Sequence, residues 1–378
     1  MRNKNLLILA FITVVILVAA SISSQNRAPQ SVVSLSLLFP ELKNQINSVT
    51  QLSVESAEGA ININKQGDNW LITESGNYPA RFDKVKQTVL ALADLKQVSQ
   101  KTSTPSLFSE LDVADIHAEN SKSRLLTLKD ASGTTLASLI VGRDAGSGVY
   151  VRKPQTNETW QTSGKLDISS DVVAWVEQNL LDIADDRIFD TRLEHPDGKV
   201  VTITRAKGEK DFTVLDVPKD KQAKSGYFVN QIGTILSNLT IENVKARQGF
   251  TFPDTAIKTT IRTYDGLVAT ILTANVDGAN VISLDFNVDE ALLAAAAAAP
   301  AAETKPAEKE AIVIGEPAKD AAPKVIDVRK EVADLNSRVG SWVYTITSAK
   351  YGLLVKEPID VIQDKPVEPA KTKEKKPG

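Results

Sequence analysis

Four aspartates fall within nine residues near the middle of the chain, at positions 182, 185, 186 and 190. Hard divalent cations bind carboxylate oxygens, and on a helix Asp182 and Asp186 would share one face. The glycine that calcium loops place at their sharp turn is missing, and Arg187 competes for the same carboxylates. Asp182, Asp185 and Asp186 are therefore only weak metal-ligand candidates, and a solvated linker is the better interpretation. We predict no resident metal.

Other reactive groups are scarce. The chain has no cysteine and two histidines, His117 and His195, and His195 lies in a His-Pro-Asp-Gly turn where a polar residue is ordinary. Residues 142–148 read GRDAGSG, which lacks the lysine and the following helix of a phosphate-binding loop and is better interpreted as a hairpin connection. We predict no catalytic residue and no cofactor.

The overall charge narrows the choice of partners. The 378 residues carry 44 Lys and Arg against 47 Asp and Glu, a formal net charge of −3. General nucleic-acid binders are usually strongly basic. We therefore expect no nucleic-acid partner.

The N-terminus predicts a membrane anchor. Arg2 and Lys4 precede an apolar run over residues 6–22, which is near the lower limit of what spans a bilayer and longer than the usual core of a signal peptide. We interpret residues 1–25 as an uncleaved signal anchor that contacts the cytoplasmic membrane through residues 6–22.

This anchor sets the predicted location. The positive-inside rule places the N-terminus in the cytoplasm and the body on the periplasmic, extracytoplasmic side of a bacterial inner membrane, as a single-pass protein. Two alternatives stay open. Ala19, Ser21 and Ser23 are small residues that a signal peptidase accepts, so the segment could be cleaved, and the run could instead be a buried helix.

After the anchor, a stalk over residues 26–44 leads into a body in which the same order of predicted elements occurs twice. In each copy, strand-like alternation is followed by one amphipathic helix and then by further strands. This order predicts an α+β fold, a tandem duplication of an antiparallel sheet domain with one or two packed helices per copy. The predicted copies cover residues 45–189 and 190–357.

Periodicity predicts where the helices lie. Pro79 precedes an apolar stripe that runs from Phe82 to Leu95, and a second stripe runs from Phe228 to Leu239. We also expect a helix over residues 172–181 to close the first copy.

Two biased segments interrupt the second copy. Residues 289–328 form an insertion whose first part is alanine-rich and could be a short helix, whereas the Pro-, Glu- and Lys-rich remainder is predicted to be disordered. Residues 358–378 form a Lys- and Pro-rich tail with the same prediction.

The order of these features resembles a known family. The residues that carry the resemblance are Trp70, residues 78–83, Thr159-Trp160, residues 172–188, Leu335-Asn336 and residues 340–344. They resemble the bacterial family catalogued as domain of unknown function 4340, over residues 45–355. The resemblance implies a membrane-anchored envelope protein, and some relatives are associated with ABC-transporter operons of the gliding-motility type. It assigns no functional residue.

We therefore expect a non-enzymatic, membrane-anchored binding or scaffold protein that serves as an auxiliary component of an ABC-type transport system. Its partners would be membrane transporter subunits, contacted through exposed strand edges. One alternative is a hydrolase or transferase of cell-wall polymers that uses Asp182 and Asp186 as acid and base. Another is a solute-binding receptor with a cleft between the copies.

Overall fold

A computed structural model describes residues 35–224, 226–298 and 326–365. The predicted anchor, residues 26–34 of the stalk, the Pro-rich part of the insertion and most of the tail lie outside these residues. Among the described helices, none combines the length and the apolar character that crossing a bilayer requires.

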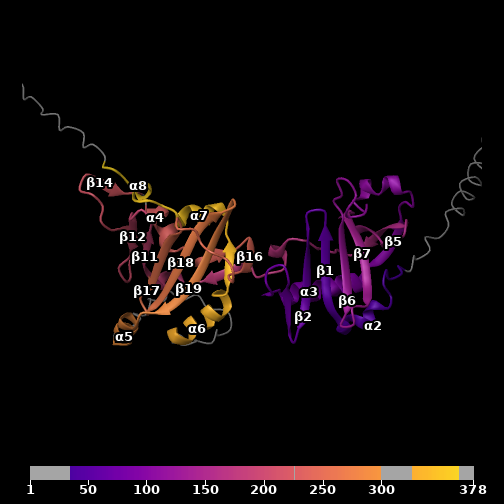
Figure 1. Ribbon diagram of the computed structural model, residues 1–378, viewed down its shortest axis with the longest axis horizontal. Coiled ribbons are helices and arrows are strands. Elements are labelled where there is room, and N and C mark those ends of the chain that lie inside the picture. The colour runs from indigo at the N-terminus through magenta and orange to yellow at the C-terminus, as the bar shows by residue number, and fades with distance from the viewer. Residues whose placement is uncertain (1–34, 225, 299–325, 366–378) are drawn as a thin grey trace, which may run out of the picture. The chain divides into compact units, whose positions relative to one another are not determined.

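The described residues form two compact units. One comprises residues 35–60 and 86–170, and the other comprises residues 61–85 and 171–365. Sheets dominate, their strands pair antiparallel, and several helices accompany them (Figure 1). The predicted α+β class with antiparallel sheets is confirmed.

One sheet has nine strands in the order β4-β3-β2-β1-β6-β7-β8-β9-β5. Its strands are β1 (Val49–Ser56), β2 (Gly59–Gln66), β3 (Asn69–Ile72), β4 (Tyr78–Pro79), β5 (Lys96–Gln100), β6 (Arg124–Asp130), β7 (Thr135–Asp144), β8 (Val149–Arg152) and β9 (Thr159–Ser163). Alternation explains these strands, because Leu52 and Val54 of β1 are buried while their neighbours are not.

A second sheet has eight strands in the order β13-β12-β11-β17-β18-β19-β20-β16. Its strands are β11 (Ile188–Glu194), β12 (Val200–Thr204), β13 (Thr213–Val214), β16 (Asn243–Ala246), β17 (Ile257–Thr263), β18 (Leu267–Val276), β19 (Ala279–Val288) and β20 (Trp342–Thr345). Two ribbons complete the strands, β10 (Asn179–Asp182) with β15 (Ser237–Thr240), and β14 (Lys221–Ala223) with β21 (Ile362–Asp364).

The two large sheets share one strand order. In the nine-stranded sheet, β1 of the meander β1-β2-β3 pairs with β6, the first of four consecutive strands, and β5 joins at the opposite edge. In the eight-stranded sheet, β11 of the meander β11-β12-β13 pairs with β17, the first of four further strands, and β16 joins at the opposite edge. The extra strand β4 is the one difference between the two orders.

The helices are mostly short. They are α2 (Leu42–Gln45), α3 (Phe82–Asp94), α4 (Gly226–Gly233), α5 (Glu290–Ala298), α6 (Val328–Val339), α7 (Ser348–Leu354) and α8 (Pro358–Val361). In α3, Val85, Val89 and Leu92 are buried as the predicted stripe requires, whereas Phe82 is exposed. The alanine-rich start of the insertion is helical, as α5.

The helix predicted over residues 172–181 is wrong. Residues Val172–Ala174 form a single 3₁₀ turn, and Asn179–Asp182 form β10. Pairing with β15 satisfies the backbone of β10 instead, and the two β-branched residues Val172 and Val173 favour helix only weakly.

The second predicted stripe is also interrupted. Helix α4 ends at Gly233, and Leu239 lies in β15 rather than on a helix. Ile235 and Leu239 are buried nonetheless, so the apolar positions were identified correctly while the period was not. At the other end of the body, Leu38 and Leu42 within the predicted stalk are buried as well.

Candidate functional site

The three predicted metal-ligand candidates lie on one exposed segment. Asp182 is the last residue of β10, and Asp185 and Asp186 begin a 3₁₀ turn that leads into β11. All three side chains are exposed. Within the described residues, no group of three or more histidine, aspartate or glutamate side chains is arranged to hold a metal ion.

Arginines surround this segment. The guanidinium of Arg205 donates to the backbone carbonyls of Asp185 and Ile188, and Arg262 Nε donates to Asp190 Oδ1 at 3.0 Å. Arg205 is itself buried against the ring of Phe212, 4.3 Å from the centroid. This cationic neighbourhood opposes the binding of a metal ion.

Arg187 does not pair with the neighbouring aspartates. Its two terminal nitrogens donate to the two carboxylate oxygens of Glu331 at 2.8 and 2.7 Å, and its Nε donates to Asp265 at 2.9 Å. Thr263 Oγ1 donates to the other oxygen of Asp265 at 2.5 Å. Hydrogen bonding raises the pKa of Arg187 above its usual range, and the contribution of Glu331 is larger than that of Asp265. We call these four residues the Arg187 cluster.

Helix α6 is held by the Arg187 cluster through Glu331, and also by its N-cap, its buried face and Asn336. Asp327 caps the helix by accepting from the backbone N–H of Lys330, and the buried face comprises Val328, Val332, Leu335 and Val339. Asn336 holds the helix against β19, because its amide accepts from the Phe286 N–H at 2.8 Å and donates to the Phe286 carbonyl at 2.7 Å. The side chain thereby takes the place of a neighbouring strand.

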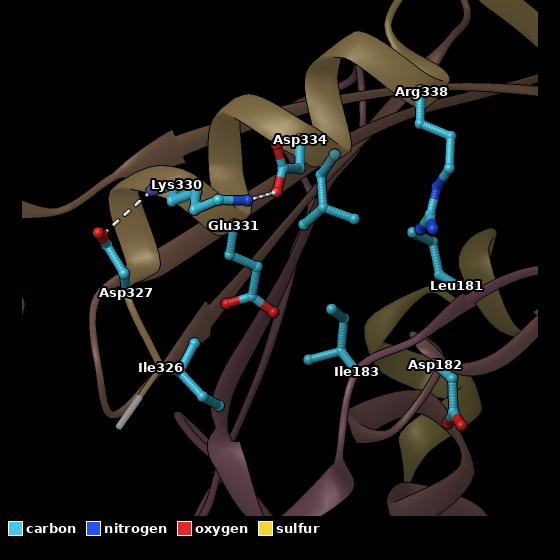
Figure 2. Close-up of a pocket in the computed structure, with 10 residues that line it drawn as sticks. Leu181, Asp182, Ile183, Ile326, Asp327, Lys330, Glu331, Asp334 and Arg338 are labelled. Atoms are coloured by element: carbon cyan, nitrogen blue, oxygen red, sulfur yellow. Dashed lines mark hydrogen bonds and ion pairs between the residues drawn. The ribbon is translucent and has the colours of Figure 1, made fainter. Parts of the chain in front are cut away.

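A groove of about 820 Å³ lies between α6 and the end of β10. In Figure 2, Leu181 and Ile183 point toward the helix, Leu181 near Arg338, and Glu331 reaches down from the helix between Ile326 and Ile183. The lining residues are Leu181, Asp182, Ile183, Ile326, Asp327, Lys330, Glu331, Asp334, Leu335 and Arg338. We call this space the α6 groove.

Three of the six charged residues that line the α6 groove form ion pairs. Glu331 binds Arg187, and Lys330 Nζ lies 2.5 Å from Asp334. Arg338 reaches the Leu180 carbonyl at 3.3 Å. Within the described residues, Asp182 and Asp327 form no ion pair, although the charge of Asp327 acts on Lys330. The groove thus combines apolar walls with two carboxylates that a ligand could neutralise.

The remaining sequence candidates are placed elsewhere. His117 is exposed, and the imidazole Nε2 of His195 lies 2.9 Å from the Lys356 carbonyl. Of the glycine-rich residues 142–148, the first three end β7 and residues 145–148 connect β7 to β8 in a hairpin, as the sequence predicts. The structure does not bring these residues to the α6 groove.

Gly148 is required by close packing rather than by phosphate. A Cβ at this position would collide with the carbonyl oxygen of Thr162 in the neighbouring strand. We expect Gly148→Ala to lower the free energy of unfolding by about 1–3 kcal/mol, the usual cost of overpacking. Urea denaturation measures it, with Gly352→Ala as the comparison, because there no atom lies within 4 Å of a Cβ and the backbone is not in the left-handed region. A harmless Gly148→Ala would contradict this packing.

Sequence reasoning missed the groove because its walls come from distant segments. The signal was present, since Val328, Val332, Leu335 and Val339 follow helical spacing directly after the insertion. Glu331 lies on the adjoining face of that pattern, but its partner Arg187 is 144 residues away in the sequence.

Fold and site together define an α+β protein whose antiparallel sheets carry a groove beneath one helix. Residues 70–257 match the model of the family described as Domain of unknown function (DUF4340), and this part of the chain belongs to that family. The resemblance seen in the sequence is thereby confirmed for these residues. No curated protein and no solved structure matches the chain significantly.

Proposed function

We propose that this protein is a non-enzymatic, membrane-anchored binding or scaffold protein on the extracytoplasmic side of a bacterial inner membrane, and that it serves an ABC-type transport system. The observation that carries the proposal is the α6 groove, an apolar-walled cavity whose central carboxylate is already committed to an arginine. Both oxygens of Glu331 accept hydrogen bonds from Arg187, so this carboxylate is not free to deliver a proton in the way a catalytic acid must.

The ribbon beside the groove supports binding. Within the described residues, β10 pairs with no strand other than β15. The Leu180 carbonyl of β10 accepts from Arg338, and an added strand would replace that contact. β-Augmentation would use the edge of β10 away from β15 for backbone hydrogen bonds and the groove for side chains. Membrane anchoring rests on the apolar run of residues 6–22, and the transport association rests on the family resemblance alone.

We also infer that the body arose by tandem duplication. The shared strand order of the two large sheets supports this. So do two small apolar clusters: Phe108 packs on Ile140 beneath the loop before β6, and Phe250 packs by Val281 beneath the loop before β17. Duplication would give the protein two domains with similar sheets, and the second of these carries the α6 groove.

Topology is tested with the full chain in its own membrane. A protease added to intact spheroplasts should digest the body, because the proposed orientation places it outside the cytoplasm. Protection of the body, with digestion only after lysis, would refute the proposed location.

The transport partner is tested by purification from native membranes through a C-terminal tag after mild crosslinking. We expect a transporter permease or ATPase subunit to co-purify reproducibly. Recovery of the protein alone contradicts the proposed role. Hydrolysis of purified cell-wall polymer by the preparation would favour the hydrolase alternative instead.

A further inference from the structure

We infer that the α6 groove binds an extended polypeptide segment of a partner protein that carries apolar side chains together with lysine or arginine. This inference rests on the proposed function, because it names the chemistry of the partner that the groove would hold.

The shape of the groove favours a chain over a compact ligand. Lining residues recur along the whole helix, from Ile326 and Asp327 before its first residue to Arg338 in its last turn. Twelve helical residues extend about 18 Å at 1.5 Å per residue. An extended strand covers that length with about five or six residues.

Apolar residues form the floor of the groove, and one of them is open to a partner. Leu181 and Ile183 from the strand side and Leu335 from α6 line the groove and are buried. Ile326, at the entrance, is 47% exposed. A partner that covers Ile326 removes apolar surface from water, which is favourable.

Charge decides the sign of the partner. Four of the lining residues are acidic and two are basic. Glu331 pairs with Arg187 and Asp334 with Lys330. Within the described residues, Asp182 and Asp327 form no ion pair, although the charge of Asp327 also acts on Lys330. In the same part of the chain, Arg338 is bound through the Leu180 carbonyl alone, so the charges outside ion pairs are two carboxylates and one guanidinium. Lysine or arginine side chains would complement the two carboxylates, whereas an acidic segment would be repelled.

A random library of 12-residue peptides, selected against the full chain in detergent micelles, tests the inference. We expect the enriched peptides to combine valine, isoleucine or leucine with lysine or arginine. We expect the double variant Asp182→Asn with Asp327→Asn to weaken the best peptide about tenfold, as loss of two complementary charges predicts. Asparagine keeps the cap of α6, and urea denaturation should show unchanged stability.

A matched double variant, Asp254→Asn with Glu242→Gln, removes the same charge from two exposed residues that do not line the groove. It should leave affinity within about twofold, because neither residue lines the groove that would hold the peptide. Enrichment of acidic or uncharged peptides, equal losses in both double variants, or no enrichment overturns the inference. Self-association of the peptide-free chain that depends on Asp182 and Asp327 also overturns it, because a second copy is then the occupant.

These outcomes are separable from those of the proposed function. If the groove variants bind peptide normally while transporter subunits still co-purify, the inference fails and the proposed function stands. If peptide binding behaves as expected while no transporter subunit co-purifies, the transport role fails and the groove assignment stands.

Discussion

Replacing Arg187 with alanine is expected to lower the free energy of unfolding by about 2–4 kcal/mol, somewhat less than the cost of breaking a fully buried ion pair, because its carboxylate partners are partly buried. The Arg187 side chain is 15% exposed and Glu331 22% exposed, so solvent does little to replace the lost interaction. Two carboxylates, Glu331 and Asp265, would be left facing one another. Urea denaturation of the full chain measures the change.

The matched control for Arg187→Ala is Arg329→Ala, because Arg329 lies on α6, the helix that carries Glu331. Arg329 pairs with Glu290, but both side chains are 65% exposed, and such pairs contribute little. Arg329→Ala should leave the unfolding free energy nearly unchanged. The double variant Arg187→Met with Glu331→Leu should recover much of the loss, because an apolar pair needs no counter-charge. If Arg187→Ala and Arg329→Ala are equally mild, the Arg187 cluster does not hold α6.

The second large effect is expected at Arg152 in β8, where alanine should cost about 3 kcal/mol through lost charge-assisted hydrogen bonds. This buried guanidinium donates to the carbonyls of Val113 and Thr156 at 2.9 and 3.0 Å, and it stacks 4.7 Å from the Phe108 ring centroid. Its removal leaves the buried Val113 carbonyl without this donor. Urea denaturation again provides the number.

Asp115 provides the comparison for Arg152. It accepts from Arg152 at 2.6 Å but is itself 77% exposed, so Asp115→Asn should have a much smaller effect. Arg152→Lys should not rescue the loss, because an ammonium cannot reproduce the guanidinium geometry. Equal losses at Arg152 and Asp115 would show that the surface ion pair, and not the carbonyl contacts, stabilises the loop before β6.

The strand pattern was largely predictable from sequence because local alternation determines it. Alternation predicts strands over residues 49–56, 60–65, 124–129, 135–142 and 268–275, and β1, β2, β6, β7 and β18 lie within about two residues of these ranges. In each, apolar residues at every second position are followed by a turn. Local periodicity and turn chemistry together are enough to define such hairpins.

The strands that sequence reasoning missed depend on distant partners. The exposure of β5 alternates, but its sequence KQVSQ is mostly polar, so only pairing with β9 defines it. The segment that contains β10 was predicted to be a helix because Val172, Val176 and Leu180 have helical spacing. Pairing with β15 makes its last residues a strand instead. Tertiary pairing overrides local preference at such sites.

The site was predictable only in part, for the same reason. Leu335-Asn336 was recognised as a family feature, but not that Asn336 would bind both backbone groups of Phe286. Arg187 was expected to compete for nearby aspartates, whereas its partners come from the turn after β17 and from α6. The tertiary fold determines which carboxylates Arg187 reaches, and a local sequence pattern carries no information about this.

Site-specific photocrosslinking of the full chain in native membranes tests most directly whether the α6 groove is where a partner docks. A photoreactive amino acid would replace Ile326 or Lys330, both exposed in the groove, and Asp254 outside it. The proposal predicts one adduct shared by positions 326 and 330, absent from position 254, whose partner is identified by mass spectrometry as a transporter subunit. Failure of both groove positions to crosslink, or identical adducts from position 254, contradicts it.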